Sequence, residues 1–124
     1  MDENTLDKIA GFICGNEKNH PVYRSSSKIT EFFGRAELPQ FVHDGSTRQR
    51  WVLDRLKECG REQLAVVLKR LVSPREYGVD REVIKSALIQ INEILYVEGF
   101  KLKLVGMEPK FETISEYGVN SLVS

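Results

Sequence analysis

The sequence has few residues of the kinds that carry out catalysis or bind metals. It contains two histidines and two cysteines among 124 residues, and none of them lies in an HExxH, GxSxG or GxxxxGK[ST] segment. Cys14, His20, His43 and Cys59 are separated by 6, 23 and 16 residues, a spacing that matches no compact zinc site. The sequence therefore predicts no catalytic residue, no metal site and no cofactor.

Long apolar runs and an excess of one charge are also lacking. No apolar run approaches the roughly 20 residues that a membrane-spanning helix needs, and the first residues are acidic and amphipathic, unlike a secretory signal. The 18 basic and 18 acidic side chains cancel. We expect a cytoplasmic protein with no membrane partner, whose cysteines are buried thiols and form no disulfide.

The charges are unevenly spread along the chain. Residues 1–20 carry two basic and four acidic side chains, residues 21–75 carry eleven and six, and residues 76–124 carry five and eight. The net charges of these segments are therefore −2, +5 and −3. This distribution argues against non-specific nucleic-acid binding by the whole chain, but it allows a local basic face in the middle segment.

Apolar residues recur at helical spacing in about five segments. The first spans about Thr5 to Cys14 with Asn4 as its cap, the second begins within the serine run 25–27 and ends at Leu38-Pro39, the third begins near Ser46 and ends at Gly60, the fourth follows at once and ends at Ser73-Pro74, and the fifth spans about Arg81 to Val97 with Asp80 as its cap. Caps, glycines and prolines at these boundaries support the assignment.

After Gly99 the apolar period changes from that of a helix to that of a strand, because Phe100, Leu102 and Leu104 alternate with lysines. A turn at 106–109 returns the chain along KFETI. We predict one mainly α domain over 1–124, a compact bundle of about five helices (core about 4–98) with a C-terminal β-hairpin (about 100–114). The uncapped tail 115–124 indicates either a longer parent protein or a tail that docks elsewhere.

The third helix begins with the stretch DGSTRQRWV, residues 44–52. Ser46 and Gln49 have the spacing of a capping box, in which each side chain accepts a hydrogen bond from the other residue's backbone. Trp51 heads the buried stripe, and a core position is favoured over an interface or base-stacking role. Arg50 is expected to pair with Asp54 at i, i+4. Arg48 has no local partner, so it lies along Trp51 or Val52, pairs with a buried carboxylate from another helix, or binds an anion.

Two helix starts combine basic residues with hydroxyls, a combination that favours anion binding, because free N–H groups and the helix dipole are positive there. The candidate residues are Arg24, Ser25 and Lys28 at the first start and Ser46, Thr47, Arg48 and Arg50 at the second. The alternatives are that the serine run is only a helix cap and that Arg50 is ordinary surface. If Arg24 and Arg48 share one face, they form the centre of the site.

The order of several short motifs resembles the N-terminal helical domain of bacterial abortive-infection-like proteins, which act in antiviral defence. The matching segments lie within about residues 20–105 and are YRSSSKITEFF, DGSTRQRWVLDRL, LVSPREYG and INEILYVEGFKL. Serine and arginine stand close to the tryptophan in that group, whereas Gln49 and Arg50 separate Arg48 from Trp51 here. The resemblance implies a sensing or assembly module whose effector part follows it or is carried by a partner chain.

These observations favour a non-catalytic interaction or sensing module that binds an acidic partner through a basic face at the two helix starts. That partner is a protein or a downstream effector domain, or else nucleic acid or a nucleotide. A winged-helix-like nucleic-acid binder is the first alternative, although the helix before the hairpin carries three acidic and two basic residues, which suits phosphates poorly. A small enzyme of unknown type is the second. Oligomeric state stays open.

Overall fold

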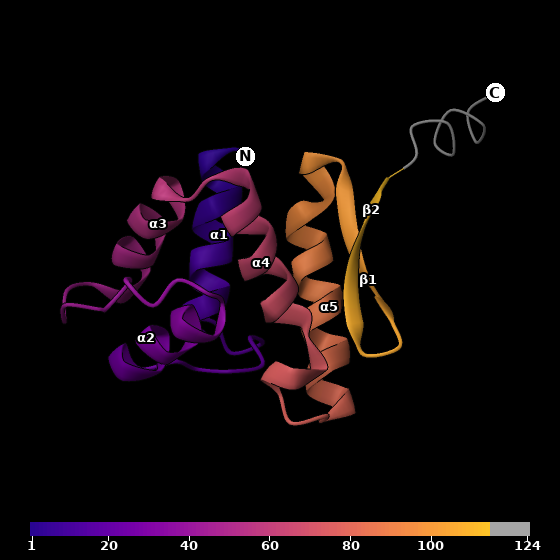
Figure 1. The fold of residues 1–124 in the computed structure, drawn as a ribbon, viewed down its shortest axis with the longest axis horizontal. Helices are drawn as coiled ribbons and strands as arrows, with labels where there is room; N and C mark the ends of the chain where they lie inside the picture. The colour runs from indigo at the N-terminus through magenta and orange to yellow at the C-terminus, as the bar shows by residue number, and fades with distance from the viewer. Residues whose placement is uncertain (115–124) are drawn as a thin grey trace.

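The computed structural model describes residues 1–114, which form five α-helices and a C-terminal β-hairpin (Figure 1). The elements are α1 (Glu3–Cys14), α2 (Ser26–Arg35), α3 (Arg48–Glu58), α4 (Arg61–Val72), the 3-10 turn η1 (Pro74–Glu76), α5 (Arg81–Leu95), the 3-10 turn η2 (Tyr96–Glu98), β1 (Phe100–Val105) and β2 (Glu108–Thr113). This architecture confirms the mainly α fold with a C-terminal hairpin. The tail 115–124 lies outside the described residues.

Helix α1 lies at the centre and packs against both α3 and α5, while the hairpin runs along α5 at one side of the molecule (Figure 1). The residues that form the core are apolar and come from all five helices and the first strand. Prominent among them are Leu6, Ile9, Ile13, Ile29, Phe32, Phe33, Val52, Leu56, Leu68, Leu71, Ile91, Leu95 and Leu102. Each large side chain buried in this way contributes about 1.5–3 kcal/mol, so the core accounts for the bundle.

Trp51 belongs to this core, as its place in the helical stripe predicts. Its side chain packs edge-on against Phe33 with ring centroids 6.0 Å apart, and the residue is 7% exposed. Phe33 also meets Phe32 and Phe41 in edge-to-face contacts. This aromatic cluster joins α2, α3 and the loop between them, and it leaves no indole face open for stacking a base.

The connection between α1 and α2 depends on Gly15. Its backbone is left-handed, with φ 72°, and a Cβ at this position would lie 2.0 Å from the carbonyl oxygen of Val22. Only glycine allows this approach. The close contact brings the residues before α2 against the C-terminal end of α1, and it thereby places Arg24 beside the last carbonyls of that helix.

Several expected helix ends are wrong by a few residues. Helix α1 begins at Glu3 after Asp2, so Asn4 lies within the first turn and is not the cap. Helix α2 ends at Arg35, and the chain turns at Glu37 with φ 65° before it reaches Pro39. The expected cap Asp80 is confirmed, because its carboxylate accepts from the amides of Glu82 and Val83. The start of α1 and the end of α2 thus differ by a few residues from the positions that local signals favour.

The prediction of a capping box between Ser46 and Gln49 at the start of α3 is also wrong. Helix α3 begins at Arg48 after Thr47, and the hydroxyl of Ser46 donates to Asp44 and makes no bond with the helix. The Gln49 side chain instead donates to Asp7 on α1 and accepts from Asn16. Gly11 on α1 provides the room, since a Cβ there would lie 3.3 Å from the Gln49 amide nitrogen. The longer-range amide contacts outcompete the local cap.

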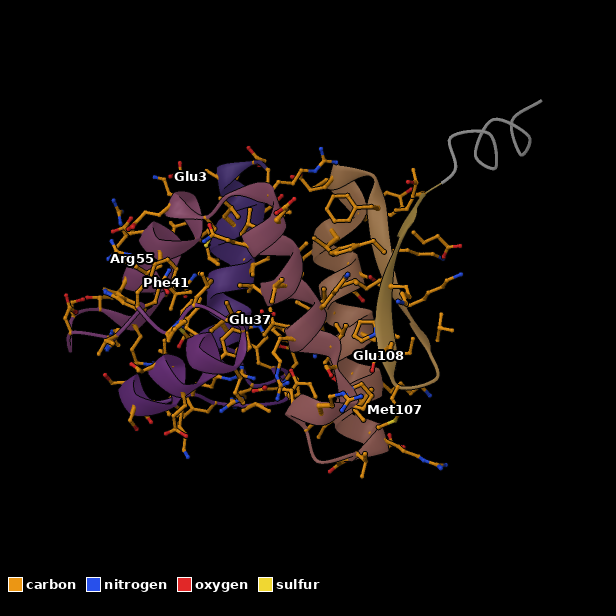
Figure 2. The ribbon with its side chains drawn as sticks, in the orientation of Figure 1. Glu3, Glu37, Phe41, Arg55, Met107 and Glu108 are labelled. Atoms are coloured by element: carbon orange, nitrogen blue, oxygen red, sulfur yellow. The ribbon has the colours of Figure 1, made fainter. Side chains whose placement is uncertain are left out.

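The hairpin pairs β1 and β2 antiparallel, with Leu102 opposite Phe111 and Leu104 opposite Pro109. Its turn is shorter than expected, because Glu108 and Pro109 already belong to β2. Met107 and Glu108 stand at the closed end (Figure 2), where Glu108 pairs with Arg75 at 2.8 Å. Leu102 is the buried residue of β1, so one face of the hairpin covers α5 as the alternation predicts.

Candidate functional site

A single carboxylate, Glu76, binds three arginines at one end of the bundle. Its Oε2 lies 3.1 Å from Nη2 of Arg24 and 2.6 Å from Nη2 of Arg35, and its Oε1 lies 2.7 Å from Nε of Arg70. The side chains of Glu76 and Arg24 are each 3% exposed, whereas that of Arg35 is 40% exposed. The cluster therefore runs from the interior to the surface.

The chain brings this cluster together from two parts that are distant in sequence, residues 24–35 and residues 70–76. Arg24 lies two residues before α2, Arg35 is the last residue of α2, Arg70 lies in the last turn of α4, and Glu76 lies in η1. The hydroxyl of Ser73 accepts from the amide of Arg75 and starts the η1 turn, and this turn carries Glu76 to Arg24 and Arg35 near the two ends of α2. Sequence reasoning singled out Arg24 alone, because the other members have no local signal.

Two opposing effects act on the pKa of the Glu76 carboxyl. Burial by itself would raise the pKa of the Glu76 carboxyl, but hydrogen bonds from Arg35, Arg70 and Arg24 outweigh it and lower the pKa below its ordinary value. Glu76 is therefore ionised at neutral pH. Three arginines against this one carboxylate leave an excess of two positive charges in the cluster.

A surface pocket of about 230 Å³ opens beside the cluster. Its lining residues are Val22, Tyr23, Arg24, Lys28, Arg35, Glu76 and Tyr77. The Lys28 side chain is 62% exposed and lies 3.5 Å from its exposed neighbour Glu31, so it stays accessible to a ligand. Arg35 uses Nε and Nη2 on Glu76 and keeps Nη1 for another acceptor. The pocket thus combines a fixed, buried arginine with two accessible cations.

Arg48, for which the sequence offers no local partner, is bound to backbone carbonyls. Its Nη2 donates to the carbonyl of Cys14 at 2.6 Å, and its Nε donates to the carbonyl of Arg24 at 3.1 Å. Its guanidinium also lies 4.5 Å from the centre of the exposed Tyr23 ring. Arg48 therefore caps the C-terminal end of α1 and ties α3 to the start of α2, an arrangement that none of the three expectations for it included.

The two helix starts are adjacent, but their candidate residues do not form one pocket. Arg24 and Lys28 line the pocket, and Ser25 flanks α2 with its hydroxyl near that of Ser27 and no bond to a helix amide. The other four, Ser46, Thr47, Arg48 and Arg50, do not line it. Arg50 is 73% exposed and pairs with Asp54 at 3.3 Å, as the i, i+4 spacing predicts. The first helix start is thus the one that contributes to the pocket.

Sequence reasoning missed a half-buried contact between Ser26 and His43. The Ser26 hydroxyl lies within hydrogen-bond distance of His43 Nδ1, which also accepts from the amide of Gly45 at 3.2 Å. These two hydrogen bonds fasten the loop before α3 to the start of α2.

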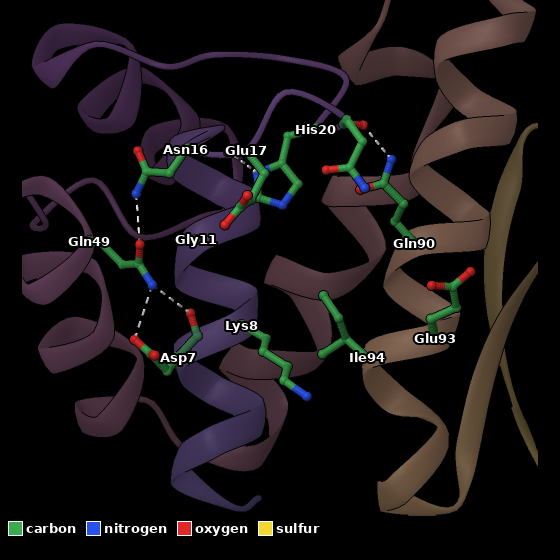
Figure 3. A pocket seen from close by; sticks show the side chains of 11 residues that line it. Asp7, Lys8, Gly11, Asn16, Glu17, His20, Gln49, Gln90, Glu93 and Ile94 are labelled. Atoms are coloured by element: carbon green, nitrogen blue, oxygen red, sulfur yellow. Dashed lines mark hydrogen bonds between the residues drawn. The ribbon is translucent and has the colours of Figure 1, made fainter.

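A second, polar pocket of about 510 Å³ lies between α1, α5 and the loop after α1 (Figure 3). Gln49 spans one side and contacts Asp7 and Asn16, while the His20 Nδ1 accepts from the amide of Glu17. Burial lowers the pKa of the His20 imidazole, against the raising effect of Glu17. The side-chain amides of Asn16, Gln49 and Gln90 donate hydrogen bonds to neighbouring residues. They therefore do not converge as free donors on a ligand in this pocket.

Both cysteines are free thiols. Burial raises the pKa of Cys14 and of Cys59 to about 11 in each case. A thiol with this pKa is almost entirely protonated at neutral pH and is a poor nucleophile and metal ligand. Within residues 1–114, no group of three or more histidine, cysteine, aspartate or glutamate side chains is placed to hold a metal ion.

Among the helices that the structure describes, none is both long and apolar enough to cross a membrane.

The geometry around Glu76 is the feature of the described residues that best fits a functional site, because it gathers accessible positive charge beside a concave surface. No protein family, curated protein or solved structure matches the chain.

Proposed function

We propose that this chain is a non-catalytic interaction module that binds an acidic partner through the pocket beside Glu76. The observation that carries the proposal is the charge balance of the cluster, in which three arginines share one carboxylate. Arginines gathered in this way attract a further anion, because charge-assisted hydrogen bonds to a carboxylate or phosphate are about twice as strong as neutral ones. A phosphate or carboxylate group of the partner completes the balance.

The size and lining of the pocket support an anionic group as the recognised feature. A volume of about 230 Å³ accommodates one such group and excludes a large ligand. Lys28 and Arg35 reach it from the surface, and Arg24 is fixed beneath them by Glu76 and by the carbonyl of Ile13. Such a preorganised cation costs little further entropy on binding. The exposed ring of Tyr23 supplies an apolar edge for the rest of the partner.

The winged-helix alternative receives less support. Helix α5, which precedes the hairpin, packs against α1, α4 and β1, so it does not project from the fold as a recognition helix would. A nucleic-acid backbone remains an anion that the pocket could receive, and the salt dependence of binding separates it from a compact acidic group. The setting of antiviral defence stays a prediction that rests on the motif resemblance.

The test is a titration of the full chain with inorganic phosphate, followed by the amide chemical shifts. We expect the amides around Tyr23, Lys28 and Arg35 to shift, and the variant Lys28→Gln/Arg35→Gln to lose the effect. A matched control is Arg81→Gln/Lys85→Gln, which removes the same charge from exposed positions on α5. Equal shifts in all three proteins would show that phosphate responds only to net charge and would refute the pocket.

A second experiment addresses the partner itself. The tagged full chain is used to recover binding proteins from the source cell, and the same recovery is repeated with Lys28→Gln/Arg35→Gln. We expect a specific partner with an acidic surface that the control variant retains and the pocket variant loses. A partner recovered equally by both variants would mean that recognition occurs elsewhere on the molecule.

A further inference from the structure

The two edges of the hairpin differ in how their backbone groups are satisfied. On β1, the side chain of Asn92 on α5 accepts from the amide of Leu102 at 2.7 Å and donates to its carbonyl at 2.8 Å. These two bonds cover the outer edge of β1 at its centre. They also show that the backbone of Leu102 points away from β2.

The register then fixes which groups of β2 point outward. Opposite residues of an antiparallel pair alternate between hydrogen-bonded and non-hydrogen-bonded positions. Leu102–Phe111 is a non-hydrogen-bonded pair, and the bond from Ile114 N to Gly99 O at 2.9 Å marks a hydrogen-bonded pair three residues further along, as the alternation requires. The amides and carbonyls of Phe111 and Thr113 therefore face outward. Within residues 1–114 they have no hydrogen-bond partner.

A groove of about 680 Å³ lies against this part of β2. Its apolar lining comes from the N-terminus, the end of α3, one face of α4 and both strands, and consists of Met1, Cys59, Leu64, Ala65, Leu68, Phe100 and Phe111. The side chains of Leu64, Phe100 and Phe111 are only partly buried by the core. A free strand edge beside an apolar groove and a helix is the arrangement by which a β-sheet takes up an extended peptide.

Pro109 limits where a strand can add. It occupies an outward position on β2 and has no N–H to offer, so pairing is directed to the segment around Phe111 and Thr113 that borders the groove. Proline on an edge strand is also a common means of preventing unlimited edge-to-edge association. The edge thus suits a short partner strand.

The solvent face of the hairpin indicates the charge of that partner. Lys101, Lys103 and Lys110 are exposed on it, and Glu112 is the acidic residue that Lys101 and Lys103 approach, at 3.8 and 3.6 Å. The side chains of an added strand alternate between the groove and this basic face. Apolar residues fit the first surface, and acidic residues fit the second.

We propose that β2 binds, by strand addition at Phe111 and Thr113, an extended peptide from another protein that alternates apolar and acidic side chains. The apolar residues enter the groove between β2 and α4, and the acidic residues lie over the lysines of the hairpin. This surface shares no lining residue with the pocket beside Glu76, so the two proposals stand or fall separately.

The probe is a blocked synthetic peptide of alternating valine and glutamate, compared with one of alternating valine and lysine. We expect the full chain to bind the first and not the second. Thr113→Pro removes one outward donor without breaking the hairpin ladder, and it should weaken binding about tenfold. Thr113→Ala keeps the N–H and should bind as the unaltered chain does.

Amide hydrogen exchange locates the contact. Binding should slow exchange at Phe111 and Thr113, whereas Lys110 and Glu112, whose amides already bond within the hairpin by the same alternation, should change little. The proposal is overturned if the acidic peptide does not bind in the millimolar range, if Thr113→Pro binds it as well as Thr113→Ala, or if protection appears elsewhere. A dimer of the chain that Thr113→Pro abolishes would also overturn it, since the occupant would then be a second copy.

Discussion

Nη2 of Arg24 lies 3.1 Å from Oε2 of Glu76, and both side chains are 3% exposed although 52 residues separate them in the chain. Buried charges of this kind are tolerated only when they are paired. The pair fixes the turn after α4 against the start of α2, and Arg35 and Arg70 extend it toward the surface. The cluster is thus both a structural tie and the base of the proposed anion pocket.

The first prediction concerns the loss of the buried carboxylate. Glu76→Gln keeps the shape of the side chain but removes the charge that compensates Arg24, so the free energy of unfolding should fall by about 3–5 kcal/mol. Chemical denaturation followed by circular dichroism measures the change. The matched control is Glu108→Gln, which removes the exposed partner of Arg75 and should leave stability essentially unchanged. Similar losses in both variants would contradict the account.

The pH dependence of stability follows from the same residue. Burial opposes ionisation of Glu76, but its three arginine partners lower the native pKa below the ordinary value. A carboxyl with a lowered native pKa stabilises the fold above its unfolded pKa of about 4.3. This contribution is lost as the pH falls from there through the native pKa. In acid titrations, Glu76→Gln should therefore lose less stability than the unaltered chain below about pH 4.3.

Curves for the two proteins that stay parallel in this range would show that Glu76 does not titrate as described. The exposed carboxyls of Glu3, Asp44 and Glu108 also have lowered pKa values. They are present in both proteins, so the difference between the curves isolates Glu76.

The third prediction separates two neighbouring arginines. Arg48→Gln removes hydrogen bonds to the carbonyls of Cys14 and Arg24, and it should lower the free energy of unfolding by about 1–3 kcal/mol. Arg50→Gln removes only an exposed contact with Asp54 and should change it by less than about 0.5 kcal/mol. Thermal and chemical denaturation of both variants measure the difference. Equal effects would refute the capping role of Arg48.

The fourth prediction concerns thiol reactivity. With pKa values raised to about 11 by burial, Cys14 and Cys59 should react slowly with a chromogenic disulfide reagent at pH 8, and both should react rapidly in denaturant. The released chromophore measures the rate. A fast-reacting thiol in the native protein would mean that one of the two sites is more open or more electropositive than its surroundings indicate.

The features that sequence reasoning predicted depend on neighbours within a few residues. The helical stripes, the alternation of Phe100, Leu102 and Leu104 and the Arg50–Asp54 pair are all local patterns, and the fold class followed from them. Even the burial of Trp51 could be inferred from its place in such a stripe. These inferences hold because hydrophobic periodicity reports directly on which face of an element is buried.

The candidate site could be predicted only in part. Lys28 and Arg24 stand at a recognisable helix start, but Glu76 reaches Arg24 across 52 residues, and no local pattern connects them. The buried carboxylate that we considered for Arg48 exists, yet it pairs with Arg24. The Gln49 side chain likewise does not form the predicted cap and instead donates to Asp7 on α1, 42 residues away. Side-chain partners at such separations depend on how the helices pack, which periodicity does not encode.

The most direct test of the proposed function is the dissociation constant for inorganic phosphate of Lys28→Gln. Lys28 lines the pocket but does not contact Glu76, so its loss should leave the free energy of unfolding unchanged. The account predicts that phosphate binding weakens at least about fivefold, the loss of one charge-assisted hydrogen bond, while Lys85→Gln binds as the unaltered chain does. An unchanged dissociation constant in folded Lys28→Gln would contradict the account.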